Sequence, residues 1–251
     1  MNRLDPPVKI QRGYYTDTAS KYDCMHCHEG AHDPECRRFI VPILNSLRIK
    51  TLLDIGSATG LGLRDLAEEL PGVFVCGAEP VAALVRHGVS TGNTHTVSLL
   101  QASGDALPFA NGSFDAVIEF AALHHVANPS VVIKEMLRVA RKVVVVADSN
   151  RFGQGSLPAR LFKLLLYKTG LWNAFNFLRT RGKHYQISEG DGLFYSYSVY
   201  DSYKILAGWA DQVLIFPSGK CDPRSWFHPL LTAPGVVLIA IRESGENKNT
   251  D

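Results

Sequence analysis

The sequence predicts an α/β fold with a doubly wound, mostly parallel sheet. Apolar runs rich in β-branched residues recur along the first 150 residues, and segments with helical apolar spacing lie between them. Strands that alternate with helices are typical of a parallel sheet with helices on both faces. The four consecutive valines at residues 143–146 support this fold class, because a strand buried on both faces reads as a continuous apolar run.

Individual elements follow from the same patterns. The strongest strand candidates are residues 51–55, 73–77, 114–119 and 142–147, with residues 96–101 as a weaker one. The spacing of amphipathic helices occurs at residues 61–70 and 130–140, and in shorter form at residues 39–47 and 81–87. After Asp148 the alternation stops, and two further strand-like runs follow at residues 212–216 and 235–242.

This order of elements predicts a Rossmann-like core interrupted by an insertion. We expect an N-terminal segment over residues 1–37, the core over 38–149, a helical and aromatic cap insertion over 150–205, and the final strands of the core over 206–244. The polar residues 245–251 are expected to form a disordered tail.

Composition narrows the classes of function. A chain of 251 residues with 46% hydrophobic content is long enough to bury one large core with a small cap. The formal net charge of +2 gives no argument for nucleic acid binding. The start, MNRLDPPVKIQRGYY, has no apolar signal-peptide region, and no apolar run approaches the roughly 18 residues of a membrane span. The five cysteines form no even disulfide framework, so we expect a soluble protein of the reducing cytoplasm, of unspecified oligomeric state.

A glycine-rich loop follows the first predicted strand, within the stretch LLDIGSATGLGLRDLAEELPGVFVCGAEP at residues 52–80. Glycine lets the backbone turn sharply and approach a ligand without a Cβ, and the next helix offers free N–H groups to that ligand. The dinucleotide fingerprint requires glycines at positions 58 and 61, where this chain has Ala58 and Leu61. A P-loop requires a lysine that this loop lacks. Neither of these two ligand classes fits.

Acidic residues mark the ends of several predicted strands. Asp54 precedes the turn at Gly56, and Glu79 ends the next strand, where a carboxylate can accept both hydroxyls of a ribose. Asp105 follows the third strand and can accept from an exocyclic amine such as that of adenine. Glu119 ends the fourth strand, just before the string AALHHV. These positions indicate a ligand that contains a nucleoside.

The four motifs DIGSATG, AEP, GDALPF and FDAVIEFAALHHV, in this order, resemble the class I S-adenosylmethionine-dependent methyltransferases. The resemblance covers about residues 38–148 and is greatest to the small-molecule branch that includes the ubiquinone and menaquinone methyltransferases. No single motif is specific, but four in this order and spacing are fairly specific. The usual loop of the family is D-x-G-x-G-x-G, and Ala58 replaces its middle glycine, which is a mild departure.

The resemblance implies a cofactor, S-adenosylmethionine, and a core sheet whose last strand is antiparallel. It also implies roles for the matched residues. Asp54 would brace the loop, Glu79 would hold the ribose, and Glu119 would lie beside the sulfonium. The other matches are Gly56, Ser57, Ala58 and Gly60, which would line the methionine moiety, and Asp105 and Ala106, which would border the adenine.

His124 and His125 are the candidate catalytic residues. They follow the fourth predicted strand, at the carboxyl edge where ligands bind in such sheets, and histidine is a suitable base near neutral pH. An oxygen acceptor usually needs such a base, whereas an amine has only to arrive unprotonated. The string ALHHV occurs in the family whatever the acceptor is, and we therefore favour a structural role for these histidines over a chemical one.

The N-terminal segment contains three cysteines and three histidines within residues 24–36. C-x-x-C with nearby histidine suits zinc, but a second, well-separated ligand pair is missing. In the resembling family a Y-x(6)-YD string at this place belongs to a lid over cofactor and substrate, and Tyr15 and Tyr22-Asp23 match it. We favour the lid over a metal site or a plain surface segment and predict no bound metal. His26 and His28 are candidate substrate contacts of this lid.

The insertion is basic and apolar, with no acidic residue between Asp148 and Glu189. We favour a cap that packs its apolar face on the core while Lys and Arg stems reach water. The alternative is a set of basic amphipathic helices that contact an anionic membrane surface through residues 157–183. An anionic or lipid-linked acceptor fits better than nucleic acid, because no alternation of basic and stacking aromatic residues is long enough to follow a strand.

The string FYSYSVYDSY at residues 194–203 supplies aromatic rings and hydroxyls. Tyr197 and Tyr200 either orient an acceptor or are core residues with polar tips. We predict a methyltransferase that acts on an oxygen or nitrogen atom, with carbon less favoured, of a small organic acceptor. The alternatives are a methyltransferase for a quinone-like or lipid-linked membrane substrate, and a non-catalytic S-adenosylmethionine-binding or scaffold protein.

Overall fold

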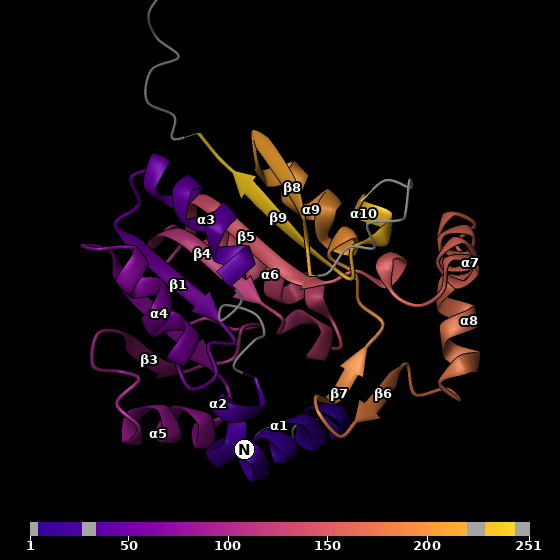
Figure 1. The fold of residues 1–251 in the computed structure, drawn as a ribbon, viewed down its shortest axis with the longest axis horizontal. Helices are drawn as coiled ribbons and strands as arrows, with labels where there is room; N and C mark the ends of the chain where they lie inside the picture. Colours follow the sequence, from indigo (N-terminus) through magenta and orange to yellow (C-terminus); the bar gives the residue numbers. More distant parts are fainter. Residues whose placement is uncertain (1–4, 27–33, 220–228, 244–251) are drawn as a thin grey trace, which may run out of the picture.

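A seven-stranded sheet in the order β3-β2-β1-β4-β5-β9-β8 forms the centre of the protein (Figure 1). The computed structural model describes residues 5–26, 34–219 and 229–243. The parallel part consists of β1 (Thr51–Ile55), β2 (Phe74–Glu79), β3 (Ser98–Gln101), β4 (Phe114–Phe120) and β5 (Ala140–Ser149). The sheet is completed by β8 (Gln212–Ser218) and β9 (Gly235–Ile241), and β9 runs antiparallel to both of its neighbours. The predicted α/β fold and its antiparallel last strand are confirmed.

Helices cover both faces of this sheet. On one face α3 (Pro34–Ser46) and α4 (Leu61–Glu69) bury Ile40, Leu44, Leu63 and Leu66 against the strands. On the other face α6 (Pro129–Val139) and α9 (Tyr203–Trp209) bury Ile133, Met136 and Leu206. The valine run of β5 divides between the two cores, with Val143 and Val145 on the first face and Val144 and Val146 on the second. Since each of the four valines is fully buried, hydrophobic burial explains the continuous apolar run.

The predicted elements agree with the observed ones except at their ends. Residues 51–55 coincide with β1, whereas β5 extends two residues beyond each end of the predicted residues 142–147. Ala140 pairs with Phe114 across an irregularity in the register, while Asp148 and Ser149 pair with Val236 and Gly235 of β9. These partners are distant in sequence, so a local pattern cannot reveal them.

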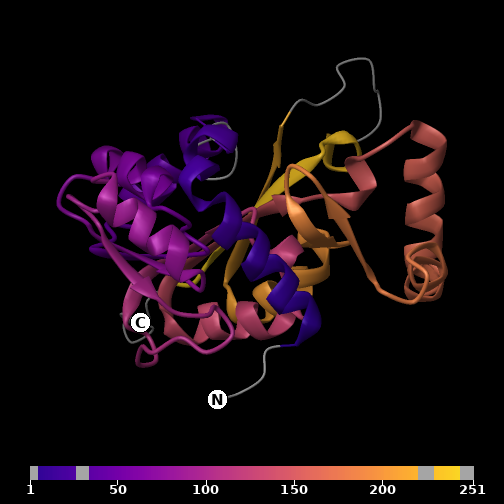
Figure 2. The same ribbon diagram turned by 90° about the horizontal axis from the view of Figure 1, so that it is seen from below.

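The insertion contains a β-hairpin that the sequence pattern did not predict. Two helices, α7 (Leu157–Lys168) and α8 (Trp172–Arg179), lead to the antiparallel pair β6 (Tyr185–Ser188) and β7 (Gly192–Tyr195). Figure 1 and Figure 2 show α7 and α8 standing beside the sheet at the end opposite to α5 (Ala82–Ser90). The N-terminal helix α1 (Pro6–Thr18) contacts both α5 and β7, and α2 (Tyr22–Met25) follows it.

Gly88 allows α5 to pack directly against the glycine loop after β1. A Cβ at this position would lie 2.0 Å from the backbone oxygen of Thr59. We expect Gly88→Ala to lower the free energy of unfolding by about 1–3 kcal/mol, the usual cost of overpacking, in urea unfolding followed by circular dichroism. Gly208→Ala in α9 is the matched control, because a Cβ there meets nothing within 4 Å. Equal stability of the two variants would contradict this packing.

Candidate functional site

A cavity of about 1210 Å³ opens at the carboxyl edge of the parallel strands. The strand order reverses between β1 and β4 at this edge, and such switch points are where open α/β sheets bind ligands. The cavity reaches from the glycine loop to the cap and is also bordered by α1, α2 and the β6–β7 turn. Representative lining residues are Gly56, Glu79, Glu119, Tyr15, Asp191 and Arg179. The predicted ligand edge and the predicted cap therefore border one space.

The glycine loop turns through left-handed backbone conformations. Gly56 has φ +79°, and a Cβ there would lie 2.6 Å from the Cβ of Ala122. Gly60 also has φ +79° and caps the start of α4. Ala58, where the resembling family has glycine, has φ +49°, a conformation that costs an L-residue about 1–2 kcal/mol. Its N–H donates to Glu79 Oε2 at 3.1 Å, which helps to hold the strained turn.

Glu79 joins the end of β2 to the loops on both sides of it. Its Oε2 accepts from the N–H of Ala58, and its Oε1 accepts from the N–H of Val81 at 2.7 Å. Each carboxylate oxygen retains a further acceptor site for a ligand hydroxyl. Burial raises the pKa of Glu79 to about 7, and the hydrogen bonds from Val81 and Ala58 oppose that rise. Burial, together with the charge of Glu79, raises the pKa of Asp54 to about 7.

Around this part of the cavity, several buried polar atoms of the described residues lack a protein hydrogen-bond partner. Among the described residues, Asp54 Oδ1, Ser57 Oγ and Glu119 Oε2 are buried and have no hydrogen-bond partner. All three residues line the cavity. Because buried polar groups in native proteins are nearly always paired, these atoms fit a site that a polar ligand completes.

The predicted adenine contacts differ from each other in position. Asp105 is exposed and lines the cavity, whereas Ala106 is exposed and lies outside the cavity lining. Asp105 is therefore placed where a ligand amine could reach it. The contact of Ala106 with adenine stays a prediction.

Known proteins similar to this chain fall into one enzyme class. Residues 53–146 match the family model described as a methyltransferase domain. An uncharacterized methyltransferase of Mycolicibacterium gilvum is 29% identical over 191 residues, which are 76% of this chain and 72% of that protein. A demethylmenaquinone methyltransferase of Beutenbergia cavernae is 33% identical over 142 residues, which are 55% of this chain and 57% of that protein.

The fold is also that of solved methyltransferases. Magnesium protoporphyrin IX methyltransferase from Synechocystis PCC 6803 with bound S-adenosylhomocysteine has a TM-score of 0.52 at 16% identity, over 97% of this chain and 90% of that chain. This chain is an S-adenosylmethionine-dependent methyltransferase. The unpaired polar atoms around the glycine loop fit this cofactor, and Asp54, Glu79 and Glu119 are the residues that would hold its polar groups.

The affinity of the methyltransferase for S-adenosylmethionine is expected to fall at acidic pH. The ionised carboxylate of Glu79 accepts hydroxyl hydrogens, and it becomes protonated as the pH falls through about 7. The stability of the folded protein depends on pH in the opposite direction. A carboxyl whose pKa rises from 4.5 in the unfolded chain to about 7 in the folded protein makes the free energy of unfolding decrease as the pH rises between these values. Calorimetric titration at several pH values measures the first effect, with Glu79→Gln as the variant that cannot titrate. An affinity of the wild type that does not depend on pH would contradict this placement.

The N-terminal helices border the cavity next to the glycine loop. Tyr15, Tyr22 and His26 line it, as the lid hypothesis requires, whereas His28 lies outside the described residues. Asp23 ties this segment to the core, because its carboxylate accepts from the hydroxyl of Thr59 in the glycine loop and from the amide of Asn93 at 3.1 Å. A movement of α2 therefore requires these two bonds to break.

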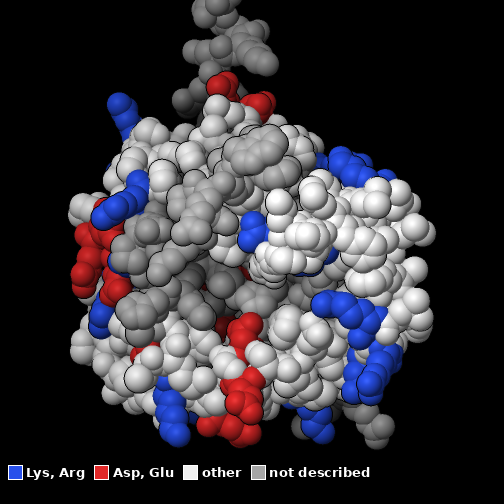
Figure 3. Space-filling view, turned by 45° about the vertical axis from the view of Figure 1, so that its right-hand side comes forward, with Lys and Arg blue, Asp and Glu red and all other residues white. Residues whose placement is uncertain are grey.

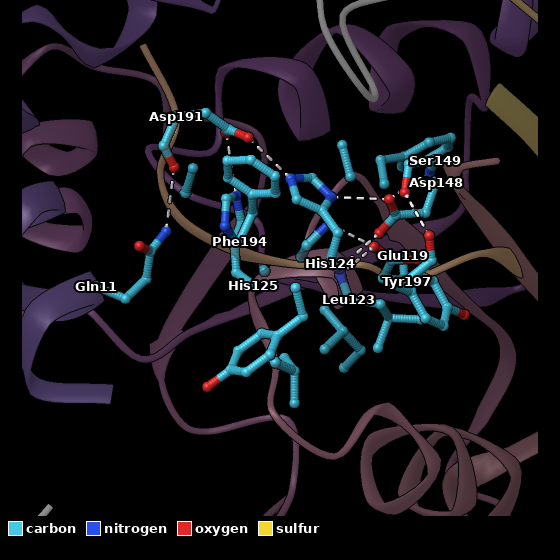
Figure 4. Close-up of a pocket in the computed structure, with 18 of the residues that line it drawn as sticks. Gln11, Glu119, Leu123, His124, His125, Asp148, Ser149, Asp191, Phe194 and Tyr197 are labelled. Atoms are coloured by element: carbon cyan, nitrogen blue, oxygen red, sulfur yellow. Dashed lines mark hydrogen bonds and ion pairs between the residues drawn. The ribbon is translucent and has the colours of Figure 1, made fainter. Parts of the chain in front are cut away.

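His124 is held between two carboxylates. Its Nδ1 lies 2.8 Å from Asp148 Oδ1, and its Nε2 lies 3.2 Å from Asp191 Oδ2 (Figure 4). Burial alone would lower the pKa of His124, but the charges and hydrogen bonds of Asp148 and Asp191 raise it well above 6.5. At neutral pH the ring is therefore an imidazolium when no other cation is bound. In that form it orients and neutralises its neighbours and cannot accept a proton.

His125 lies beside His124, with the ring centroids 4.0 Å apart. Its Nδ1 donates to the carbonyl oxygen of Leu193 in β7 at 2.7 Å. Its Nε2 lies 2.9 Å from the hydroxyl of Tyr15 and 3.2 Å from Asp191 Oδ1. Burial raises the pKa of Tyr15, so this hydroxyl remains a donor at neutral pH. The catalytic role of either histidine stays a prediction, but both line the cavity.

The two tyrosines predicted near the acceptor have different surroundings. Tyr197 is buried, lines the cavity and shares a 2.7 Å hydrogen bond with the hydroxyl of Ser202. Tyr200 lies outside the cavity lining and packs against the core between β5, α6 and α9. Tyr197 is therefore the better placed of the two to contact an acceptor.

Sequence reasoning did not identify three charged groups that line the cavity near His124 and the cap, namely Asp148, Asp191 and Arg151. Asp148 is the next-to-last residue of β5 and lies at the same sheet edge as the other carboxylates, a position that the sequence pattern shows. Asp191 lies in the turn between β6 and β7, where α1 positions it: Gln11 donates to the carbonyl oxygen of Asp191 at 3.4 Å, and the hydroxyl of Tyr14 donates to that of Glu189 at 2.7 Å. Arg151 is buried and pairs with Asp201.

Proposed function

We propose that the methyltransferase transfers a methyl group to an oxygen or nitrogen atom of a small organic acceptor that carries negative charge. The observation that carries this proposal is the continuity of one cavity, which runs from Asp54 and Glu79 past His124 to Lys163 and Arg179 of the cap. The first end suits the cofactor, and the remaining volume suits a second ligand, since pockets for one drug-sized molecule span about 300–1,000 Å³.

The chemistry asks little of the protein beyond positioning. S-adenosylmethionine supplies an electrophilic methyl group on a sulfonium, whose neutral thioether leaving group needs no proton. The chain has to align the acceptor and exclude water. Alignment of the reactants can supply a large part of the reduction in activation free energy. His125, Tyr15 and Tyr197 surround the middle of the cavity and are the groups that we expect to orient the reacting atom.

The cap supplies positive charge to the far end of the cavity. The ammonium of Lys163 donates to the carbonyl oxygens of Arg151 and Gln154, each at 2.9 Å, and has no acidic partner among the described residues. Arg179 donates to the amide oxygen of Asn176 at 3.1 Å and likewise lines the cavity. Cations that lack a carboxylate partner favour an acceptor with a carboxylate or phosphate group.

This proposal is tested by measuring the formation of S-adenosylhomocysteine with a panel of phenols and amines. Each compound carries a carboxyl group and is supplied both as the free acid and as its methyl ester. We expect the acids to be the better substrates. Arg179→Gln should raise KM for them by about tenfold or more, the scale of one hydrogen bond to a charged group, with little change in kcat. Lys168→Gln is the matched control, because Lys168 is exposed on α7 outside the cavity lining. Equal rates for acids and esters would contradict an anionic acceptor.

A lipid-linked or quinone-like acceptor is a second candidate, which the exposed apolar surface of the cap favours. Leu165 is 60% exposed and Leu178 is 75% exposed. Further exposed apolar residues of α7, α8 and the turn between them are Leu157, Leu161, Phe162, Leu171 and Phe177. Figure 3 shows Lys and Arg side chains around a mainly uncharged surface on this side of the molecule. Basic residues next to exposed apolar side chains are typical of helices that lie on anionic membranes.

Sedimentation with liposomes that contain phosphatidylserine tests the second candidate. We expect association that weakens at high salt and is reduced in a Leu165→Ser/Leu178→Ser variant, with neutral liposomes as the control. No helix in the described part of the chain is both long and apolar enough to cross a membrane, so only surface contact is at issue. An absence of salt-dependent association would remove this candidate.

A further inference from the structure

Three side chains converge at the middle of the cavity with the composition of a metal site. They are His124 and His125, from the turn of 3-10 helix after β4, and Asp191, from the β6–β7 turn. One ligand atom from each lies within 4.8 Å of the other two. Figure 4 shows Asp191 and Asp148 on opposite sides of the His124 ring, with His125 beside it. Two imidazoles and one carboxylate are a ligand set for Zn²⁺ and for other borderline divalent ions.

Both imidazole rings are held through the nitrogen that faces away from the point of convergence. Asp148 Oδ1 lies 2.8 Å from Nδ1 of His124, and the carbonyl oxygen of Leu193 lies 2.7 Å from Nδ1 of His125. Each Nδ1 is therefore a donor, and each Nε2 is left to face Asp191. Metal-binding histidines are nearly always oriented in this way, by a carboxylate or a backbone carbonyl on the other nitrogen.

Asp191 presents one carboxylate oxygen to each of the two imidazoles. His125 Nε2 lies 3.2 Å from Asp191 Oδ1 and 2.9 Å from the hydroxyl of Tyr15. His124 brings its own Nε2 to 3.2 Å from the other oxygen of the same carboxylate. At such a position an imidazole nitrogen and a carboxylate oxygen can share either a proton or a metal ion. One divalent ion would satisfy both contacts at once.

The separations also match a coordination sphere. With metal–nitrogen and metal–oxygen bonds of about 2.0–2.1 Å, neighbouring ligands of a tetrahedral ion lie about 3.3 Å apart. The two observed separations between imidazole nitrogen and carboxylate oxygen are 3.2 Å. The side chains of His124 and His125 are only 14% and 10% exposed, which shields the position from bulk water. These two separations involve different oxygens of Asp191, and with one ligand atom from each residue the three atoms lie within 4.8 Å of one another.

We infer that His124, His125 and Asp191 bind one divalent transition-metal ion, Zn²⁺ in the first instance, at the acceptor end of the cavity. Three protein ligands leave a position open, as in catalytic zinc sites. An acceptor hydroxyl could occupy that position and lose its proton to solvent, because metal binding lowers the pKa of a bound oxygen. The resulting oxyanion forms the bond to the methyl carbon while the carbon–sulfur bond breaks and its electron pair remains on sulfur. This role rests on the proposed function, whereas the metal binding does not.

Isothermal titration of the full-length, untagged and chelator-stripped protein with ZnCl₂ tests the site, with MnCl₂ and anaerobic FeSO₄ as parallel titrations. We expect about one equivalent of ion to bind. Asp191→Asn, which keeps the shape of a ligand and removes its charge, should weaken binding by at least tenfold. Asp148→Asn should weaken it by about 10–100-fold, as removal of the partner of a metal-binding histidine does. Circular dichroism of each variant verifies that it is folded.

The Cys/His-rich segment requires its own control, because Cys24 and Cys27 also offer zinc ligands. A Cys24→Ser/Cys27→Ser variant should retain the site, and the Co²⁺-loaded protein should show ligand-field bands without strong thiolate charge transfer. Three results would overturn the inference. None of the three ions binds, Asp191→Asn binds the ion as tightly as the wild type does, or only the cysteine variant loses binding. These titrations contain no acceptor, so their failure would leave the proposed methyl transfer standing, and inactivity towards the acceptor panel would leave the metal site standing.

Discussion

Glu79→Ala is expected to weaken the binding of S-adenosylmethionine by about 1.5–3 kcal/mol, or about 10–150-fold, the scale of hydrogen bonds to a charged group. The variant loses the acceptor that we expect to hold the ribose. It also releases the N–H groups of Ala58 and Val81, which Glu79 holds at 3.1 and 2.7 Å. Because Ala58 has a strained backbone conformation, the loop should become less well ordered as well. Isothermal titration calorimetry with S-adenosylmethionine measures the loss.

Glu68→Ala is the matched control for this prediction. Glu68 is an exposed residue of α4, and its removal changes the net charge by the same amount. We expect its affinity for S-adenosylmethionine to equal that of the wild type. Wild-type affinity in Glu79→Ala would show that the ribose does not lie at the end of β2.

His124→Ala is expected to lower the free energy of unfolding by about 3–5 kcal/mol, the usual cost of removing one partner from a buried ion pair. The side chain of Asp148 is fully buried and has its pKa lowered: burial alone would raise it, but the charge of His124 and hydrogen bonds outweigh burial. Without the imidazolium, that carboxylate would remain near Glu119 with no positive neighbour among the residues that the structure describes. Urea unfolding in the presence of a chelator, which removes any bound metal ion, measures the cost.

A double variant separates the loss of charge pairing from the loss of packing. His124→Ala/Asp148→Asn leaves no unpaired charge at Asp148, so we expect it to recover part of the stability that the single variant loses. The pair is in direct contact, so the two substitutions should not be additive. A cost below about 1 kcal/mol for His124→Ala would contradict the ion-pair description, since that is the range of exposed pairs.

The parts of the fold that repeat a local pattern could be predicted from the sequence. The valine run of β5, the amphipathic spacing of α6 and the glycine turn after β1 each carry their structural cause within a few neighbouring residues. The common location of Asp54, Glu79 and Glu119 could also be predicted, because each lies at or one residue before the end of a parallel strand, and the carboxyl ends of such strands meet at one edge. Their contacts with the cofactor stay predictions.

The acceptor end could not be predicted in this way, because its contacts join residues far apart in the chain. Asp191 reaches His124 only because α1 binds the β6–β7 turn through Gln11 and Tyr14, about 175 positions away. Arg151 belongs to the basic insertion, in which the sequence predicts that Lys and Arg stems reach water. Its side chain is instead buried and pairs with Asp201. The guanidinium carbon lies 5.2 Å from the centroid of the Trp172 ring. Such pairings depend on tertiary structure, and no spacing in the sequence encodes them.

A crystal structure with S-adenosylhomocysteine bound tests the central claim most directly, namely that the cofactor lies across the switch point between β1 and β4. We predict that both ribose hydroxyls lie within hydrogen-bond distance of the Glu79 carboxylate, that the methionine moiety lies over residues 56–60, and that the sulfur faces His124 and His125. A complex in which the ribose contacts another part of the cavity, or in which the sulfur faces away from the two histidines, would contradict this account.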